Sequence, residues 1–237
     1  MPGTKAFDLL RESSPTLGVV ILSADLMQLG SEVALLEGLG IKVIHFDVMD
    51  GCFVPKMTAG PPLIKGIKTP LLKDAHLMIH DPLEKVGDYV RAGADIVTVH
   101  VESCDDVLPV LRELGRMENT NDSDRGLIRG VALNPGTPLD ILGSLLGDLE
   151  MIQVLAVNPT VKGMPFDESV GERFRAVQEM VSGTKREILL TLDGGITREN
   201  ITDFARMGAD LVVSGSAVFS DDGPKVNVPY MLNALRS

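Results

Sequence analysis

Tryptophan is absent from this chain, and tyrosine and phenylalanine are so scarce that aromatic residues make up only 4% of the 237 residues. A core must therefore be built from aliphatic side chains and methionine, which suits a parallel sheet packed between helices. The only cysteines are Cys52 and Cys104, and two cysteines exclude a disulfide scaffold. Sparse cysteine favours a reducing compartment, so we expect a cytoplasmic protein.

Basic residues are also outnumbered: 22 Lys and Arg stand against 33 Asp and Glu, for a formal net charge of −11. This acidic balance argues against a nucleic-acid partner and against an anionic membrane surface. No apolar run approaches the length of a membrane span, and Asp8, Arg11 and Glu12 interrupt the stretch where a signal peptide would be apolar. A phosphorylated small molecule stays compatible with the charge, because backbone N–H groups bind phosphate locally.

The chain does contain a regular alternation of strand-like and helix-like segments. The expected strands are Val19–Leu22, Val43–Asp47, Ala75–Ile79, Ile96–Val101, Ile128–Leu133, Met151–Val157, Ile188–Leu192 and Leu211–Val213. Such alternation implies a parallel sheet, and eight units in this length predict a closed (β/α)8 TIM barrel. An open doubly wound sheet is the main alternative, but no G-x-G-x-x-G fingerprint follows the first strand.

One domain over residues 1–237 accounts for this pattern, because the composition does not change along the chain. A short leading helix is expected over Lys5–Arg11. The polar segment near residues 118–125 is interpreted as a surface insertion, since it is too short for a domain linker.

The second expected strand carries the first sign of chemistry. Side chains alternate along a strand, so His45, Asp47 and Met49 share one face. A histidine and a carboxylate one strand repeat apart make half of a divalent metal site. The alternative for this stretch taken alone is a satisfied core histidine beside an aspartate that caps the next turn.

Further polar residues lie at the ends of other expected strands, where catalytic groups of such barrels sit. His76 belongs to the third strand and Asp193 follows the seventh. Together with His45 and Asp47 they form a set of two histidines and two carboxylates, which suits Zn²⁺, Mn²⁺, Fe²⁺ or Co²⁺.

Glycines follow the last two expected strands. Asp193–Thr197 leads from a strand into a helix, and Ser214–Ser216 follows the next strand. Glycines there let backbone N–H groups approach an anion, and loops after strands seven and eight are a common phosphate site in these barrels. The alternative is a pair of tight turns in which glycine only eases the backbone.

These segments resemble the ribulose-phosphate 3-epimerase family, in order, from about Val19 to Phe219. The matching motifs are Ile21–Asp25, His45–Pro55, Ala75–Ile79, Thr98–Glu102, Leu133–Pro138, Val157–Pro159, Asp193–Ile196 and Ser214–Ala217. The resemblance implies a (β/α)8 barrel with one catalytic divalent metal ion and a small phosphorylated ketose as substrate. It also implies a homo-oligomer of unspecified size.

The resemblance further assigns roles to residues of this chain. His45, Asp47, His76 and Asp193 would be the metal ligands. Asp47 and Asp193 would also be the acid and the base that move the proton through a metal-stabilised enediolate. Substrate contacts would come from Ser23, Met49, Met78, Gly194, Gly195, Gly215 and Ser216, the last four of them at the phosphate.

The chain departs from the family at a loop that usually reads Gly-Phe-Gly-Gly-Gln after Val-Asn-Pro. Here residues 160–166 read Thr-Val-Lys-Gly-Met-Pro-Phe. Lys162 and Gly163 are therefore candidates for a lid or a phosphate contact, and a solvated loop lysine is the alternative for Lys162. Leu155 replaces a family methionine, and Lys56 stands where the family usually has Asn.

Four functions follow as hypotheses. The first is interconversion of D-ribulose 5-phosphate and D-xylulose 5-phosphate, and the second is 3-epimerisation of another ketose phosphate, such as allulose 6-phosphate. The third is a non-catalytic barrel that binds a sugar phosphate, and the fourth is a metal-free phosphate-binding barrel like those of tryptophan or histidine synthesis. The metal and acid–base set argues for the first two, because binding alone needs no acid–base pair.

Overall fold

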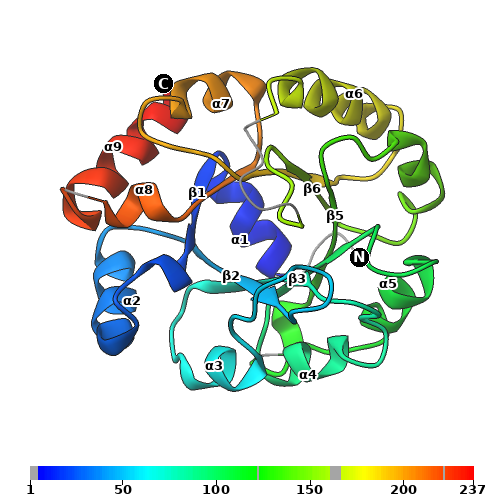
Figure 1. The fold of residues 1–237 in the computed structure, drawn as a ribbon, viewed down its shortest axis with the longest axis horizontal. Helices are drawn as coiled ribbons and strands as arrows, with labels where there is room; N and C mark the ends of the chain where they lie inside the picture. Colours follow the sequence, from blue (N-terminus) through cyan, green and yellow to red (C-terminus); the bar gives the residue numbers. More distant parts are fainter. Residues whose placement is uncertain (1–4, 122, 161–166, 221) are drawn as a thin grey trace.

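Eight parallel strands form a closed barrel in the computed structural model, which describes residues 5–121, 123–160, 167–220 and 222–237 (Figure 1). The strands are β1 (Thr16–Val20), β2 (Val43–Met49), β3 (Leu72–Met78), β4 (Ile96–His100), β5 (Ile128–Leu133), β6 (Met151–Leu155), β7 (Leu189–Asp193) and β8 (Leu211–Ser214). Each strand pairs with the next along the chain, and β8 closes the barrel by pairing with β1. The predicted (β/α)8 TIM-barrel fold is confirmed.

The described helices surround this barrel, apart from α1. They are α1 (Lys5–Ser13), α2 (Leu29–Gly38), α3 (Pro61–Gly66), α4 (Val86–Arg91), α5 (Leu108–Leu114), α6 (Val170–Ser182), α7 (Ile201–Met207), α8 (Ser216–Phe219) and α9 (Pro224–Arg236). Short 3-10 turns lie at η1 (Ile21–Ser23), η2 (Leu26–Gln28), η3 (Ser123–Arg125) and η4 (Leu139–Ser144). No helix of the described ranges is both long and apolar enough to cross a membrane.

Two expected strands begin three residues earlier in the structure. The first begins earlier, at Thr16, and ends at Val20, because Ile21–Ser23 turns into a 3-10 helix. The third begins at Leu72 rather than Ala75, so it includes two charged residues that the sequence suggested were outside it. Lys73 and Asp74 are both buried there, and the Lys73 ammonium donates to backbone carbonyls of α3 and the turn after it.

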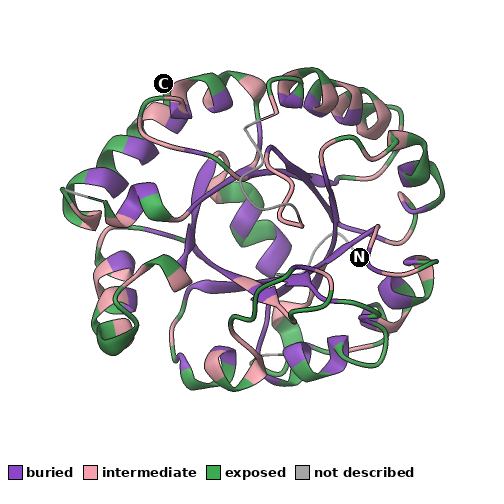
Figure 2. Ribbon diagram, viewed as in Figure 1, coloured by how far each residue is buried: buried purple, intermediate pink, exposed green. Residues whose placement is uncertain are grey.

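The strand alternation divides the core into two parts. Outward-facing strand residues pack against the helices, and Figure 2 shows the inner faces of those helices buried. Inward-facing apolar residues at the amino ends of the strands form a second cluster with Ala6, Phe7 and Leu10 of α1. Figure 1 accordingly shows α1 lying across the middle of the barrel. This helix closes the amino-terminal end of the barrel with apolar side chains.

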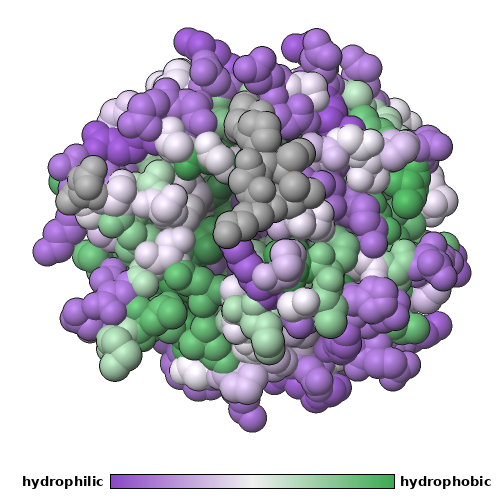
Figure 3. Space-filling view, in the orientation of Figure 1, coloured by the Kyte–Doolittle hydropathy of each residue, from purple (hydrophilic) through white to green (hydrophobic). Residues whose placement is uncertain are grey.

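The face in Figure 3 is mixed in polarity. Apolar side chains gather over α2 and α3, where Leu29, Val33 and Leu63 help to line a shallow groove.

Adjacent leucines of α1 allow its role as a plug to be tested. Leu10 is fully buried in the inner cluster, whereas Leu9 is 50% exposed. We expect Leu10→Ala to lower the free energy of unfolding by about 2–5 kcal/mol, because it leaves a cavity at the end of the barrel. Leu9→Ala is the matched control and should cost far less. Equal losses in urea denaturation would contradict the plug.

Candidate active site

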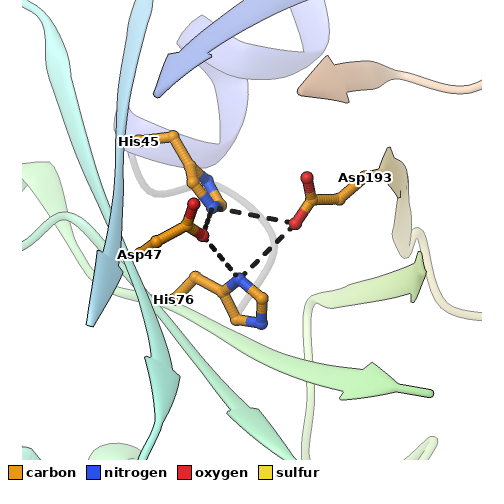
Figure 4. A group of neighbouring side chains, drawn as sticks. All are labelled: His45, Asp47, His76 and Asp193. Carbon is orange, nitrogen blue, oxygen red and sulfur yellow. Dashed lines mark hydrogen bonds and ion pairs between the residues drawn. The ribbon is translucent and has the colours of Figure 1, made fainter. Parts of the chain in front are cut away.

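Four side chains from three strands converge inside the barrel (Figure 4). His45 and Asp47 point inward from β2, His76 from β3 and Asp193 from the end of β7, and one ligand atom of each lies within 4.8 Å of the others. Asp47 Oδ1 is 3.3 Å from His45 Nε2 and 3.3 Å from His76 Nδ1. Asp193 Oδ2 is 3.5 Å from His76 Nδ1 and 3.9 Å from His45 Nε2.

Strand register explains why these residues meet. Asp47 and His76 are partners in the β2–β3 ladder, so their side chains project side by side toward the barrel axis. His45 lies one strand repeat earlier on the same face of β2. Asp193 lies at the end of β7, and closure of the barrel places that strand across from β2 and β3.

The spacing of these atoms fits a divalent metal ion. Ligand atoms around a tetrahedral Zn²⁺ lie about 3.3–3.6 Å from one another, given bond lengths of about 2.0–2.2 Å. The four histidine–carboxylate separations of 3.3–3.9 Å are close to this range, and all the ligand atoms lie within 4.8 Å of one another, so a bound ion would draw the set together. His45 also donates its Nδ1–H to Asp74 Oδ2 at 2.7 Å. Such a bond leaves Nε2 free to face a metal, as a carboxylate behind a ligating histidine usually does.

The two candidate acid–base carboxyl groups titrate differently. Burial opposes ionisation of Asp47, but hydrogen bonds with His45 and His76 outweigh it and hold its pKa well below the ordinary range. Burial raises the pKa of Asp193 to about 6, and the nearby charge of Asp47 adds to the rise. Carboxyl groups with pKa values pushed apart in this way are typical of sites that use one as a base and one as an acid.

The carboxylates, rather than the histidines, face open space. Asp47 exposes 25% of its side chain and Asp193 13%, whereas the figures for His45 and His76 are 0% and 1%. Above them is a cavity of about 270 Å³. Its described lining is Val20, Ser23, Asp47, Asp193, Gly194, Gly195, Ile196, Thr197, Val213, Ser214, Gly215 and Ser216.

Glycine is required in the two loops of the cavity lining that follow β7 and β8, the glycine loops. Gly194 and Gly195 have φ values of 97° and 67°, in the left-handed region that other residues rarely adopt. Gly215 approaches Ser23 so closely that a Cβ there would lie 2.6 Å from Ser23 Oγ. The described lining contains no lysine or arginine. Within the described lining, an anion bound at these loops would depend on backbone N–H and hydroxyl groups.

The remaining predicted site residues fall into two groups. Met49 and Met78 are register partners at the ends of β2 and β3, one strand repeat beyond Asp47 and His76. They are not part of the described cavity lining. Lys162 and Gly163 lie outside the described residues.

Two residues at the site were missed by the sequence reasoning. Asp74 lies behind His45, as described above. Gln153 is fully buried on β6, and its amide nitrogen is 2.8 Å from Asp193 Oδ2 and 3.2 Å from His76 Nδ1. A polar residue at an inward position of the otherwise apolar strand Met151–Leu155 was the available signal.

His100 on β4 contacts His76 on the side of the ring away from the cluster. The two Nε2 atoms are 2.8 Å apart, and His100 Nδ1 is 3.0 Å from Glu102 Oε2. Burial lowers the pKa of His100 to about 4, so the ring is neutral near pH 7.

Comparison with known proteins places this geometry in context. Residues 16–219 match the model of the "Ribulose-phosphate 3 epimerase family". A protein named ribulose-phosphate 3-epimerase from Bacillus subtilis (strain 168) is 36% identical over 208 residues, covering 86% of this chain and 92% of the relative. One of the same name from Escherichia coli (strain K12) is 34% identical over 220 residues, covering 91% and 93%.

Solved structures support the fold. KGPDC from Streptococcus mutans superposes with a TM-score of 0.69 at 15% identity, covering 94% of this chain and 98% of the other. The 3-hexulose-6-phosphate synthase from Salmonella typhimurium gives a TM-score of 0.62 at 21% identity, covering 93% and 98%. At these identities the likeness concerns the fold alone.

The buried His100 should make the stability of the metal-free protein depend on pH. Its pKa is about 4 in the folded chain and 6.5 in its ordinary state. Between these values the unfolded chain binds a proton that the folded chain does not. This group alone therefore lowers the free energy of unfolding by about 3 kcal/mol as the pH falls from about 6.5 to about 4.

His100→Gln should remove that component, so its free energy of unfolding from urea denaturation should fall less over this pH range than that of the unsubstituted protein. His80→Gln, which removes a histidine whose side chain is 63% exposed, is the control. A pH dependence in His100→Gln as steep as in the unsubstituted protein would contradict the buried neutral ring.

Proposed function

The chain belongs to the ribulose-phosphate 3-epimerase family, and from that premise we propose that it interconverts D-ribulose 5-phosphate and D-xylulose 5-phosphate at this site. The observation that carries the proposal is the convergence of two carboxylates and two histidines beside a cavity that the glycine loops also line. The carboxylates can exchange a proton, and the glycine loops can hold a phosphate.

Epimerisation inverts a carbon next to a ketone, so it needs a base on one face of that carbon and an acid on the other. Asp47 and Asp193 come from β2 and β7, which are separated in the barrel by β1 and β8. Their carboxylates face each other across the cluster (Figure 4). One aspartate removes the proton and the other returns a proton from the opposite face. The two exchange roles in the reverse reaction.

His45, Asp47, His76 and Asp193 would hold the divalent metal ion. Bound there, the ion would act as a Lewis acid that polarises the ketone and makes the neighbouring proton more acidic. The donor set of imidazole nitrogens and carboxylate oxygens is compatible with Zn²⁺, Fe²⁺, Mn²⁺ or Co²⁺. His45 and His76 have no exposed surface to spare for substrate, so their part is to hold the ion in place.

The glycine loops orient the substrate. We assign the phosphate to the backbone of Gly194, Gly195, Gly215 and Ser216, with the Ser23 hydroxyl beside it. Met49 and Met78 would offer a polarizable, nonbasic surface beyond the carboxylates.

A second candidate substrate is another ketose phosphate, such as allulose 6-phosphate. The observation that favours it is the altered sequence of residues 160–166, together with Leu155 on β6, where the family usually carries a different loop and a methionine. Membership of an epimerase family argues against the non-catalytic and the metal-free barrel. The homo-oligomer stays a prediction.

Removing either carboxylate should stop the reaction. We expect Asp47→Asn and Asp193→Asn each to lower kcat by about 10²–10⁴-fold or more while leaving a folded barrel, because an amide cannot move the proton. Asp88→Asn, at an exposed aspartate on α4, is the control. Turnover would be measured on D-ribulose 5-phosphate, with circular dichroism and metal content on the same samples. Near-normal turnover in either variant would refute the two-aspartate assignment.

Crowding the glycine loops should weaken substrate binding. The Cβ of Gly215→Ala would lie 2.6 Å from Ser23 Oγ and 3.1 Å from Val20 Cβ, so the backbone must shift where the phosphate is proposed to bind. We expect KM to rise by about tenfold, or about 1.4 kcal/mol of binding. Gly38→Ala, whose Cβ meets no atom within 4 Å, is the matched control. An unchanged KM in Gly215→Ala would contradict the assignment of the phosphate site to this loop.

A further inference from the structure

The two histidines of the metal cluster use different ring nitrogens and have different groups behind them. His45 presents Nε2 to the cluster and donates Nδ1–H directly to the Asp74 carboxylate. His76 presents Nδ1, so the nitrogen left over is Nε2. No carboxylate meets that nitrogen among the described residues. Its partner is the His100 ring, whose Nε2 lies 2.8 Å away.

A nitrogen-to-nitrogen contact of this length requires one proton, held by one ring and accepted by the other. Which ring holds it decides whether His76 has a lone pair on Nδ1. A neutral imidazole carries its single proton on either Nδ1 or Nε2. If His100 carried its proton on Nε2, His76 would have to accept on Nε2 and carry its own proton on Nδ1. Metal could not bind there.

The contact with Glu102 determines which nitrogen of His100 carries its proton. Its Oε2 lies 3.0 Å from His100 Nδ1, and an ionised carboxylate can only accept a hydrogen bond. His100 therefore carries its proton on Nδ1 and offers a lone pair on Nε2. His76 then donates from Nε2, which leaves its Nδ1 available to a metal ion. Without metal, that Nδ1 faces the Asp47 carboxylate at 3.3 Å, and a bound ion would replace this contact.

The surroundings hold this arrangement in place. Glu102 Oε1 accepts from the backbone N–H of Asn134 at 2.8 Å and bonds the Thr137 hydroxyl at 2.5 Å. His100 is fully buried, stacks on His76 with ring centroids 5.0 Å apart, and is covered by the Phe53 ring at 4.9 Å.

We propose that Glu102 and His100 form a relay that keeps the proton of His76 on Nε2 and so makes its Nδ1 a metal ligand. Both are positioning residues, since they act through His76. The proposal rests on the metal centre proposed above and adds the groups that set the protonation pattern of one of its ligands.

The relay predicts an unusual ranking of two substitutions. In Glu102→Gln, the Asn134 N–H holds the amide oxygen at the Oε1 position, so the NH₂ group must face His100 Nδ1. That nitrogen then accepts, the His100 proton moves to Nε2, and the His76 proton is forced onto Nδ1. In Glu102→Ala, a water molecule can occupy the space and accept from His100. The nearly isosteric Gln should therefore be more harmful than Ala, which a purely structural role for Glu102 would not predict.

Asp74 supplies the matched control, because it is also a buried carboxylate behind a cluster histidine. Its Oδ1 has no hydrogen-bond partner within the described part of the chain. Nothing therefore fixes the orientation of an amide in Asp74→Asn, and its oxygen can still accept from His45 Nδ1–H. Here the ordinary ranking should hold, with Asn less harmful than Ala.

The experiment is a Zn²⁺ titration of metal-free protein against a competing chelator, for the unsubstituted chain and the four variants. We expect Glu102→Ala to raise the Zn²⁺ dissociation constant by about tenfold and Glu102→Gln by about 100-fold or more. At Asp74 the order should be reversed, with a smaller rise for Asn than for Ala. Long-range ¹⁵N NMR of the histidine rings provides the second readout. The His100 proton should be on Nδ1 in the unsubstituted zinc protein, and the His76 proton on Nδ1 in Glu102→Gln.

Several outcomes would overturn the proposal. Zn²⁺ affinity in Glu102→Gln equal to or higher than in Glu102→Ala would do so, as would a His100 proton on Nε2 in the unsubstituted protein. The NMR result on the unsubstituted chain stands even if a variant fails to fold. If the unsubstituted chain bound no Zn²⁺, the metal centre itself would be wrong. If that chain bound Zn²⁺ but Glu102→Gln were less harmful than Glu102→Ala, the relay would be wrong and the metal centre would stand.

Discussion

The ladder between β8 and β1 holds the candidate site together, although none of the four cluster residues lies on either strand. It pairs Thr16–Val19 with Leu211–Ser214 and so closes the sheet. Asp193 on β7 is separated from β2 only by β8 and β1 along the closed side of the barrel, and closure brings it within 3.9 Å of His45. In an open sheet the strands from β2 to β7 would separate the two aspartates. Opposed acid and base groups therefore depend on closure as well as on their residue types.

Burial then determines what the cluster can do. Two carboxylates in a low-dielectric interior repel each other, which contributes to the raised pKa of Asp193. A divalent cation among them would offset that repulsion and replace the weak contacts of 3.3–3.9 Å with coordination bonds. The plug formed by α1 keeps the opposite end of the barrel largely apolar. The same arrangement gives His45 and His76 buried partners that fix their orientation.

Much of this was predictable from the sequence, and the reason is the two-residue period of a strand. Alternation places His45 and Asp47 on one face without knowledge of any neighbour, and the count of strand–helix units predicts the barrel. Asp74 and Gln153 were missed because their roles depend on which residues stand opposite them on other strands. Lys73 and Asp74 also look like loop residues in sequence, since a charged pair rarely begins a buried strand. Similarly, His100 and Glu102 belong to a recognisable motif, but their contact with His76 depends on the β3–β4 register, which pairs His76 with Thr98.

The central claim is that a proton is removed and returned at C3 of a five-carbon ketose phosphate by the aspartates of β2 and β7. It is tested most directly by proton NMR of metal-loaded protein with D-ribulose 5-phosphate in D₂O. The account predicts the appearance of D-xylulose 5-phosphate with deuterium at C3. Exchange without that product would show a working base in a pocket made for another ketose phosphate. No exchange, with metal confirmed bound, would contradict the account.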